Sequence, residues 1–187
     1  MKVFVVYWHP EPRSFNAAMF QAACGTLTAA GHKRSELPTF MRCALIQFQA
    51  GRTLTVKDPN YLKPDRGNER HRNERVSDEI ESEIRKIEWC EMMIWQFPLW
   101  WFGLPAVLKG WVDRVFAMGR TYGGGRIYQS GVFRGKRALL SLTTGGPEDA
   151  YRKGAFNGDI NGILRPIAIS GDASCDLLCN HAGKRRE

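Results

Sequence analysis

The chain has 187 residues, which is enough for one domain of ordinary size and too few for two comfortable ones. Apolar residues make up 43% of the chain and charged residues 25%, values typical of a globular protein that can form a sizeable core. The formal net charge of +8 favours anionic partners such as phosphorylated cofactors, and it fits a basic, solvated surface equally well.

The first part of the chain predicts a strand followed by a helix. The run from Lys2 to Trp8 is β-branched, aromatic and nearly all apolar, as expected for a strand buried on both faces of a parallel sheet. A proline-rich loop follows, and the alanine-rich segment 16–31 predicts a helix that ends at Gly31. This order is the beginning of a β-α-β unit.

The same alternation continues in the middle of the chain. Isoleucines at helical spacing follow Ser77, which we expect to be the N-cap of a helix. A second helix contains Pro105 in its first turn, where proline is tolerated. The predicted elements are a helix over 77–90, a strand over 91–97, a helix over 104–116 and a strand over 136–144. Strands that alternate with helices predict an α/β domain with a parallel sheet.

A membrane span over 92–116 is not expected, although this segment is long and apolar. Pro98, Gly103 and Pro105 interrupt it, and charged residues lie in its second half. Two shorter buried elements joined by a turn explain the pattern better, so we expect no membrane insertion.

The five cysteines are odd in number and irregular in spacing. The start of the chain turns polar too soon for a signal peptide, so we expect free thiols in a reducing cytoplasm. Cys175, Cys179 and His181 lack a fourth ligand and depart from the usual zinc spacings, so we expect no metal site.

Three loops follow three predicted strands, and ligands bind at these strand ends in open parallel sheets. In the first loop, His9, Arg13, Ser14 and Asn16 can donate to phosphate oxygens at a helix N-terminus. The simpler interpretation is a helix capped by Ser14 or Asn16. The glycine pattern of a dinucleotide-binding Rossmann unit is missing, which disfavours a nicotinamide bound in that manner.

The second loop is aromatic and the third is rich in glycine. Consecutive bulky residues cannot follow one helix or strand period, so a wall beside a planar heterocycle fits them better than a core does. The residues of this wall are Pro98, Leu99, Trp100, Trp101 and Phe102. The backbone amides of Thr143, Thr144, Gly145 and Gly146 can approach the polar edge of such a ring. Together the three loops indicate a flavin nucleotide.

The segments HPEPRSFN, QFPLWWFGLPAVLKGWVDRVF, FRGKRALLSLTTGG and YRKGAFNGDINGILRPI resemble the flavodoxin-like NAD(P)H:quinone oxidoreductases, the DT-diaphorase family. The resemblance covers residues 2–31 and 89–166. It implies a doubly wound parallel sheet of five strands with helices on both faces, tightly bound FAD and a cytoplasmic homodimer. It also implies two-electron hydride transfer from NAD(P)H through the flavin to a quinone by a ping-pong route. No nucleic-acid partner is expected.

The resemblance assigns a role to each matching residue. The loop that holds the FAD pyrophosphate and ribityl chain is matched by His9, Ser14, Phe15 and Asn16. Residues 98–102 match the loop along the flavin ring, and residues 143–146 match the loop at its polar edge. Tyr151 and Asn157 match catalytic positions beside the reduced flavin.

Two of the matching positions differ from common members of the family. Asn157 stands where the best-known members carry histidine and another branch carries asparagine. Asparagine cannot accept a proton near neutral pH, so a charge relay through this position is in doubt. Trp100 replaces a common glutamine, which makes the predicted pocket more apolar.

Two segments depart from the family pattern, near 32–55 and over 168–187. Permitted codons for residues 39–52 can be read two nucleotides later as LYAMRFDPVSGR, which resembles the family and indicates a compensated frameshift. The final segment shows no strand pattern, so we expect the fifth strand to be missing. We therefore divide the chain into a flavin-binding domain over 1–167 and an atypical tail over 168–187.

The departures keep other functions open. One alternative is a flavodoxin-like regulatory or interaction subunit, and another is a frameshifted, inactive family member. FMN replaces FAD as the expected cofactor if the altered end has removed part of the adenine site.

Overall fold

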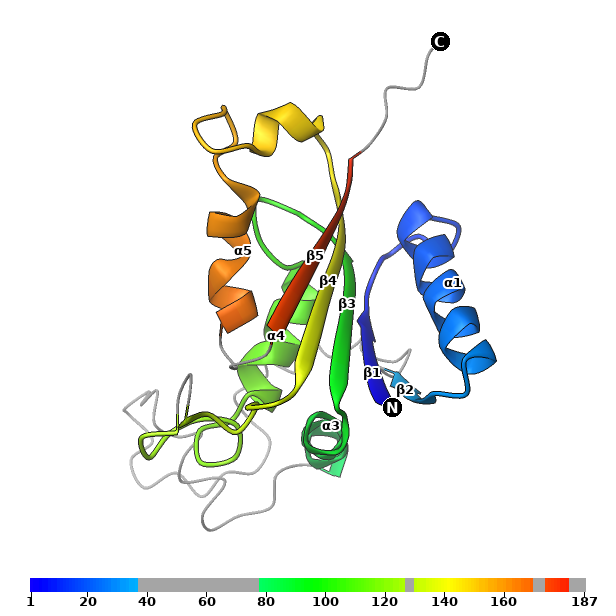
Figure 1. Ribbon diagram of the computed structural model, residues 1–187, viewed down its shortest axis with the longest axis vertical. Coiled ribbons are helices and arrows are strands. Elements are labelled where there is room, and N and C mark those ends of the chain that lie inside the picture. The colour runs from blue at the N-terminus through cyan, green and yellow to red at the C-terminus, as the bar shows by residue number, and fades with distance from the viewer. Residues whose placement is uncertain (37–77, 127–129, 170–173, 182–187) are drawn as a thin grey trace, which may run out of the picture.

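The computed structural model describes residues 1–36, 78–126, 130–169 and 174–181. Its centre is a sheet of five parallel strands in the order β2-β1-β3-β4-β5 (Figure 1). The strands are β1 Lys2–Tyr7, β2 Lys33–Glu36, β3 Met92–Pro98, β4 Arg137–Thr144 and β5 Ser174–His181. The order 2-1-3-4-5 is that of flavodoxin-like proteins, and its direction of winding reverses between β1 and β3. The predicted α/β class and doubly wound sheet are confirmed.

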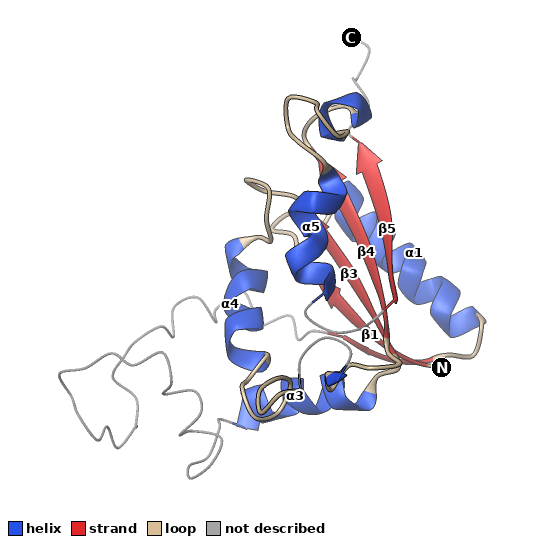
Figure 2. Cartoon of the chain, turned by 60° about the vertical axis from the view of Figure 1, so that its left-hand side comes forward, coloured by secondary structure: helices blue, strands red, loops and turns tan. Residues whose placement is uncertain are grey.

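Helices cover both faces of the sheet, as Figures 1 and 2 show. They are α1 Phe15–Ala29, α3 Asp78–Trp89, α4 Ala106–Val115 and α5 Ile160–Ile169, with a short 3₁₀ turn, η3, at Glu148–Tyr151. The helix α1 packs on one face through Phe20 and Leu27, while α3, α4 and α5 share a larger core on the other face.

The strand β1 shows why these residues form a central strand. Val3 and Val5 point to the α1 face, and Phe4 and Val6 point to the opposite face, so all four side chains are fully buried. Burial on both faces requires the near-continuous apolar run from which the strand was predicted.

The fifth strand corrects the sequence-based expectation that it is missing. Within the segment assigned to the tail, Ser174–His181 pairs in parallel with β4 from Arg137 to Thr144. A parallel edge strand is held by main-chain hydrogen bonds to one neighbour, and these bonds need no regular apolar pattern. The sequence of β5 mixes polar and apolar residues, so the periodicity that identified β1 could not reveal it.

The segment near 32–55, which also departs from the family pattern, begins with a regular strand. Lys33–Glu36 forms β2 beside β1, with Lys33 opposite Lys2. The rest of that segment, which includes the suspected frameshift, and the predicted N-cap Ser77 lie outside the described residues.

Two buried cysteines are free thiols, Cys24 and Cys90. Burial raises the pKa of both thiols, and Glu36 adds to the increase at Cys24. Because the thiolate is the reactive form, both side chains are structural, unreactive groups at neutral pH.

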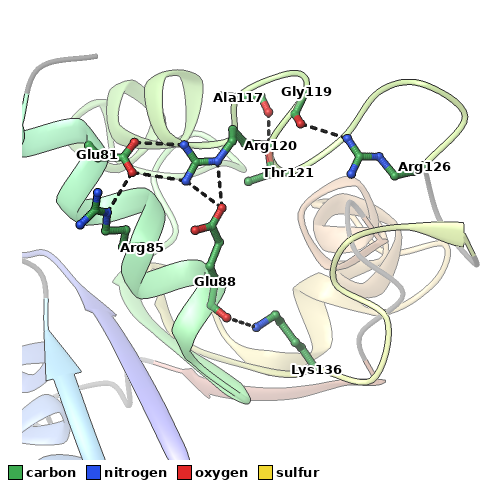
Figure 3. Close-up of polar contacts among 9 residues, drawn as sticks. All are labelled: Glu81, Arg85, Glu88, Ala117, Gly119, Arg120, Thr121, Arg126 and Lys136. Atoms are coloured by element: carbon green, nitrogen blue, oxygen red, sulfur yellow. Dashed lines mark hydrogen bonds and ion pairs between the residues drawn. The ribbon is translucent and has the colours of Figure 1, made fainter. Parts of the chain in front are cut away.

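A group of ion pairs fastens the segment after α4 to the outer side of α3 (Figure 3). Arg120 lies 3.1 Å from an Oε atom of Glu81 and 2.9 Å from one of Glu88. Arg85 also pairs with Glu81, at 2.9 Å. Hydrogen bonds from Arg120 and then from Arg85 hold the pKa of Glu81 below its usual value.

This arrangement predicts a pH-dependent loss of stability in Arg120→Met. The lowered pKa of Glu81 means that its stabilising effect is present above the unfolded-state pKa and is lost as the pH falls through the folded-state pKa. Urea unfolding should therefore show a loss of about 1 kcal/mol near pH ~7, after allowance for solvent screening, and a loss that shrinks as the pH falls through the folded-state pKa of Glu81.

Arg126→Met is the matched control. Arg126 belongs to the same segment and donates to the backbone oxygens of Gly119 and Gly123, as Figure 3 shows for Gly119. Carbonyl groups do not titrate, so any effect of this change should be the same above and below that pKa. Equal losses in Arg120→Met above and below it would contradict the assignment.

Candidate functional site

The three predicted loops meet at one edge of the sheet. They follow β1, β3 and β4, which are neighbours in the sheet order. The backbone nitrogen of Trp8 donates to the oxygen of Gln96 at 3.3 Å, and that of Leu99 donates to the oxygen of Thr143 at 2.8 Å. The parallel pairing therefore continues beyond the ends of the strands and brings the predicted cofactor-binding segments together.

The first loop turns directly into α1. Ser14 is the N-cap, and its hydroxyl accepts a hydrogen bond from the nitrogen of Ala17 at 3.1 Å. The capping interpretation is thus confirmed for Ser14. The backbone nitrogen of Glu11 donates to Nδ1 of His9 at 3.0 Å, which holds the imidazole over the turn. Phe15, the first residue of the helix, is largely exposed.

Asn16 does not point outward with its neighbours in this loop. Its side chain is buried, and its Nδ2 donates to Oγ1 of Thr143 at 2.8 Å. Its Oδ1 accepts from Nε2 of Gln96 at 2.7 Å. Asn16 therefore links the first loop to the third loop through the inside of the protein.

The second loop is a tight turn with unusual backbone geometry. Trp100 and Gly103 exchange backbone hydrogen bonds of 3.2 and 3.0 Å. The two residues between them have positive φ angles, 49° at Trp101 and 60° at Phe102. Bulky residues rarely adopt this left-handed conformation, which costs about 1–2 kcal/mol per residue.

The strained turn separates the aromatic side chains. Leu99 is buried beneath the turn, whereas Trp101 is 96% exposed and Trp100 and Phe102 are about half exposed. Pro98 ends β3 inside the core. The rings of Trp101 and Phe102 thus belong to the surface beside the strand ends, where a flat ligand can reach them.

Trp8 supports the second loop from beneath. Its ring meets that of Trp100 edge-on, with 5.4 Å between the centroids. Its Nε1 is buried and has no hydrogen-bond partner among the described residues. Trp8 was predicted only as part of a strand, because an aromatic residue at the end of an apolar run is ordinary.

The third loop brings the two predicted catalytic residues together. A Cβ atom at Gly146 would lie 3.3 Å from Cε2 of Tyr151 and 3.4 Å from Nδ2 of Asn157. The backbone nitrogen of Asn157 donates to the oxygen of Ala150 at 2.9 Å, which closes the loop. The rings of Tyr151 and Phe102 lie 6.5 Å apart, so the third loop also reaches the aromatic turn.

Only one of the two glycines in this loop lies closely against neighbouring side chains. No atom lies within 4 Å of a Cβ atom placed on Gly145, so that side of the backbone is open. At Gly146 the backbone approaches Tyr151 and Asn157 closely. The side chain of Thr144 is turned inward and donates to the oxygen of Gly146 at 3.0 Å.

The residues at this edge fit a flavin nucleotide. A capped helix N-terminus favours phosphate, exposed aromatic rings favour a planar ring, and an open glycine allows close approach to backbone amides. Among the described residues, no three His, Cys, Asp or Glu side chains gather in a way that could hold a metal ion. No helix in that part of the chain is both long and apolar enough to cross a membrane.

Residues 1–169 match a family described as having a flavodoxin-like fold. The chain is 38% identical over 168 residues to NAD(P)H dehydrogenase [quinone] 1 of Cavia porcellus, and the match covers 89% of the chain and 61% of that relative. It is 36% identical over 172 residues to ribosyldihydronicotinamide dehydrogenase [quinone] of Rattus norvegicus, with 89% and 73% covered. The chain belongs to the flavodoxin-like quinone oxidoreductase family.

A solved structure agrees with this membership. The crystal structure of a Klebsiella pneumoniae protein assigned as a quinone reductase superposes with a TM-score of 0.81 at 31% identity. The superposed region covers 100% of this chain and 78% of the solved chain. The chain thus spans about three fifths of the Cavia porcellus relative and more of the bacterial protein.

Proposed function

We propose that the protein is a flavin-dependent NAD(P)H:quinone oxidoreductase, in which hydride passes from NAD(P)H to a quinone in two half-reactions. The observation that supports this most is the meeting of a capped helix N-terminus, exposed aromatic rings and an open glycine loop at one sheet edge. A bound flavin supplies reversible hydride uptake, which no amino-acid side chain offers.

Each group of residues has its own task in this proposal. The start of α1, with His9, Ser14 and Phe15, binds the phosphates and the chain that joins them to the ring. In the wall from Pro98 to Phe102, the exposed aromatic side chains orient the flavin ring and exclude water from one side of it, and the buried Pro98 and Leu99 support them. The amides of Gly145 and Gly146 donate to the polar edge of the ring.

Tyr151 and Asn157 lie at the same edge and complete the proposed catalytic set. Both side chains can donate a hydrogen bond to an oxygen of the ring or of a quinone. Asn157 stabilises charge there by hydrogen bonding alone, since an amide does not take up a proton near neutral pH. FAD is the preferred cofactor and FMN the alternative, and the active form is a cytoplasmic homodimer.

The visible absorption spectrum of the purified protein tests the proposal first. Bands near ~370 and ~450 nm, followed by NAD(P)H oxidation that depends on a quinone, are the expected result. A yellow protein without this activity would favour a regulatory subunit. A colourless, aggregated protein that takes up neither FAD nor FMN would favour the frameshifted, inactive alternative. Chromatography of the released flavin distinguishes FAD from FMN.

The two glycines of the third loop give a paired prediction. Gly145→Ala should leave the stability of the flavin-free protein unchanged, because its methyl group meets no protein atom within 4 Å. It should weaken flavin binding about fivefold if the ring occupies the open side. Gly146→Ala should instead destabilise the flavin-free protein by about 1 kcal/mol, because Tyr151 and Asn157 must move.

Thermal unfolding without flavin and a fluorescence titration with flavin measure the two effects separately. Both glycines have φ angles outside the positive region, so alanine adds no backbone strain at either position. Unchanged flavin affinity in Gly145→Ala would place the ring away from this loop.

A further inference from the structure

Gln96 is a polar residue in the most deeply buried strand of the sheet. Every residue of β3 from Met92 to Pro98 is buried, and Gln96 is 3% exposed. A buried amide costs about 1–3 kcal/mol unless it is hydrogen-bonded, so an apolar residue would suit the core better. Packing alone therefore does not explain why an amide occupies this position.

The hydrogen bonds of Gln96 form a directed chain. Nε2 of Gln96 donates to Oδ1 of Asn16 at 2.7 Å, and Nδ2 of Asn16 donates to Oγ1 of Thr143 at 2.8 Å. The Asn16 amide in the middle of this hydrogen-bond chain accepts at its oxygen and donates at its nitrogen. Because Oγ1 of Thr143 already accepts from Asn16, the hydroxyl hydrogen must point elsewhere.

This hydrogen-bond chain joins the three elements that build the candidate site. Gln96 lies two residues before the end of β3, and Asn16 lies in the first turn of α1. Thr143 is the second-last residue of β4. The backbone oxygen of Gln96 also accepts from Trp8, and that of Thr143 accepts from Leu99. One buried polar chain therefore fixes the spacing between the phosphate end and the ring end of the site.

We infer that Gln96 is a positioning residue, which acts through Asn16 to turn the Thr143 hydroxyl into a hydrogen-bond donor toward the polar edge of the flavin ring. This inference rests on the proposed function. A donor at that edge favours the electron-rich, reduced form of the ring over the oxidised form. Gln96 therefore raises both the affinity for the flavin and its reduction potential.

Gln96→Met tests the role of the Gln96 amide with little change of side-chain size and no change of charge. Methionine has no N–H donor, so the oxygen of Asn16 is no longer held toward position 96, and the Asn16 amide turns over and presents that oxygen to Thr143. The Thr143 hydroxyl then donates inward and is lost to the ligand. We expect a flavin dissociation constant about tenfold higher and a lower reduction potential.

Thr143→Val removes the hydroxyl donor itself, at the other end of the hydrogen-bond chain, and keeps the shape of the side chain. It should reproduce both effects, and adding Gln96→Met to it should change the reduction potential no further. Ser141→Ala removes another buried polar side chain, opposite Gln96 in the β3–β4 register, and should leave the reduction potential unchanged. Thermal unfolding of the flavin-free variants separates loss of folding from loss of the donor.

The outcomes distinguish the inference from the proposed function. Wild-type protein that takes up neither FAD nor FMN overturns the proposed function and this inference with it. Wild-type protein that binds flavin, together with an unaltered reduction potential in both Gln96→Met and Thr143→Val, overturns the inference alone. Should Gln96→Met fail to fold, the potential of Thr143→Val decides.

Discussion

Replacement of Glu83 by alanine is expected to lower the free energy of unfolding by about 3 kcal/mol, because it breaks a buried polar cluster. Glu83 is 5% exposed on the inner side of α3. Its carboxylate accepts from Nζ of Lys86 at 2.5 Å and from Nε1 of Trp111 in α4 at 3.3 Å. Nζ of Lys86 also donates to the backbone oxygen of Glu36 in β2 at 3.2 Å.

This cluster joins α3 to α4 and to the outermost strand β2. Removing the carboxylate leaves the indole of Trp111 without its acceptor and the ammonium of Lys86 with only the backbone oxygen of Glu36. The ammonium can partly recover its hydration, since 19% of the Lys86 side chain is exposed. For this reason we expect a loss at the lower end of the range for broken buried ion pairs.

Urea unfolding near neutral pH measures the effect, and Glu79→Ala is its control. Glu79 lies in the first turn of the same helix and is exposed, so its replacement should change stability by less than ~0.5 kcal/mol. Replacing Glu83 and Lys86 together by leucine and methionine should recover much of the loss, because no charge then remains buried. Equal effects of the changes at positions 79 and 83 would refute the role given to the cluster.

The sequence was informative wherever burial imposes a regular pattern. The apolar runs of β1 and β3 and the isoleucines of α3 gave elements within one or two residues of those observed. A cap at Ser14 or Asn16 was also predicted, and Ser14 provides it, because a side-chain oxygen just before a helix can accept from the free backbone amides of the first turn. These features depend on local chemistry, which a sequence displays directly.

Features that depend on the pairing of distant segments were missed. The strand β5 is defined by its register with β4, and its own sequence has no strand period. Gln96 stands alone as an amide among apolar residues, and this was the available signal. Its partner Asn16, and Thr143 to which Asn16 donates, become neighbours of it only once the order of β1, β3 and β4 is known.

The aromatic loop falls between these two cases. Its composition predicted an apolar wall beside a flat ligand, and the structure buries Leu99 of that wall and exposes the three aromatic side chains after it. The positive φ angles of Trp101 and Phe102 could not be predicted, since residues of this size normally avoid them. Backbone strain at exposed, bulky residues lowers the stability of the fold, so it indicates that these residues serve a function such as ligand binding.

Trp101→Asn should therefore make the protein more stable and a poorer enzyme at the same time. The Trp101 side chain is 96% exposed, so its removal uncovers almost no apolar core. Asparagine tolerates a φ near 49° far better than tryptophan does, which should add about 1 kcal/mol to the free energy of unfolding. Without the ring, kcat/KM for a quinone should fall about tenfold or more.

Trp101→Phe separates the two effects, because it keeps an aromatic ring and the strain. It should retain most of the activity and none of the gain in stability. The measurements are urea unfolding of the flavin-free protein and steady-state kinetics with one quinone at fixed NAD(P)H. A Trp101→Asn variant with unchanged kcat/KM would show that the ring does not face the quinone. A variant less stable than wild type would show that the exposed indole makes contacts that outweigh the strain, and the turn would then be a structural feature of the fold.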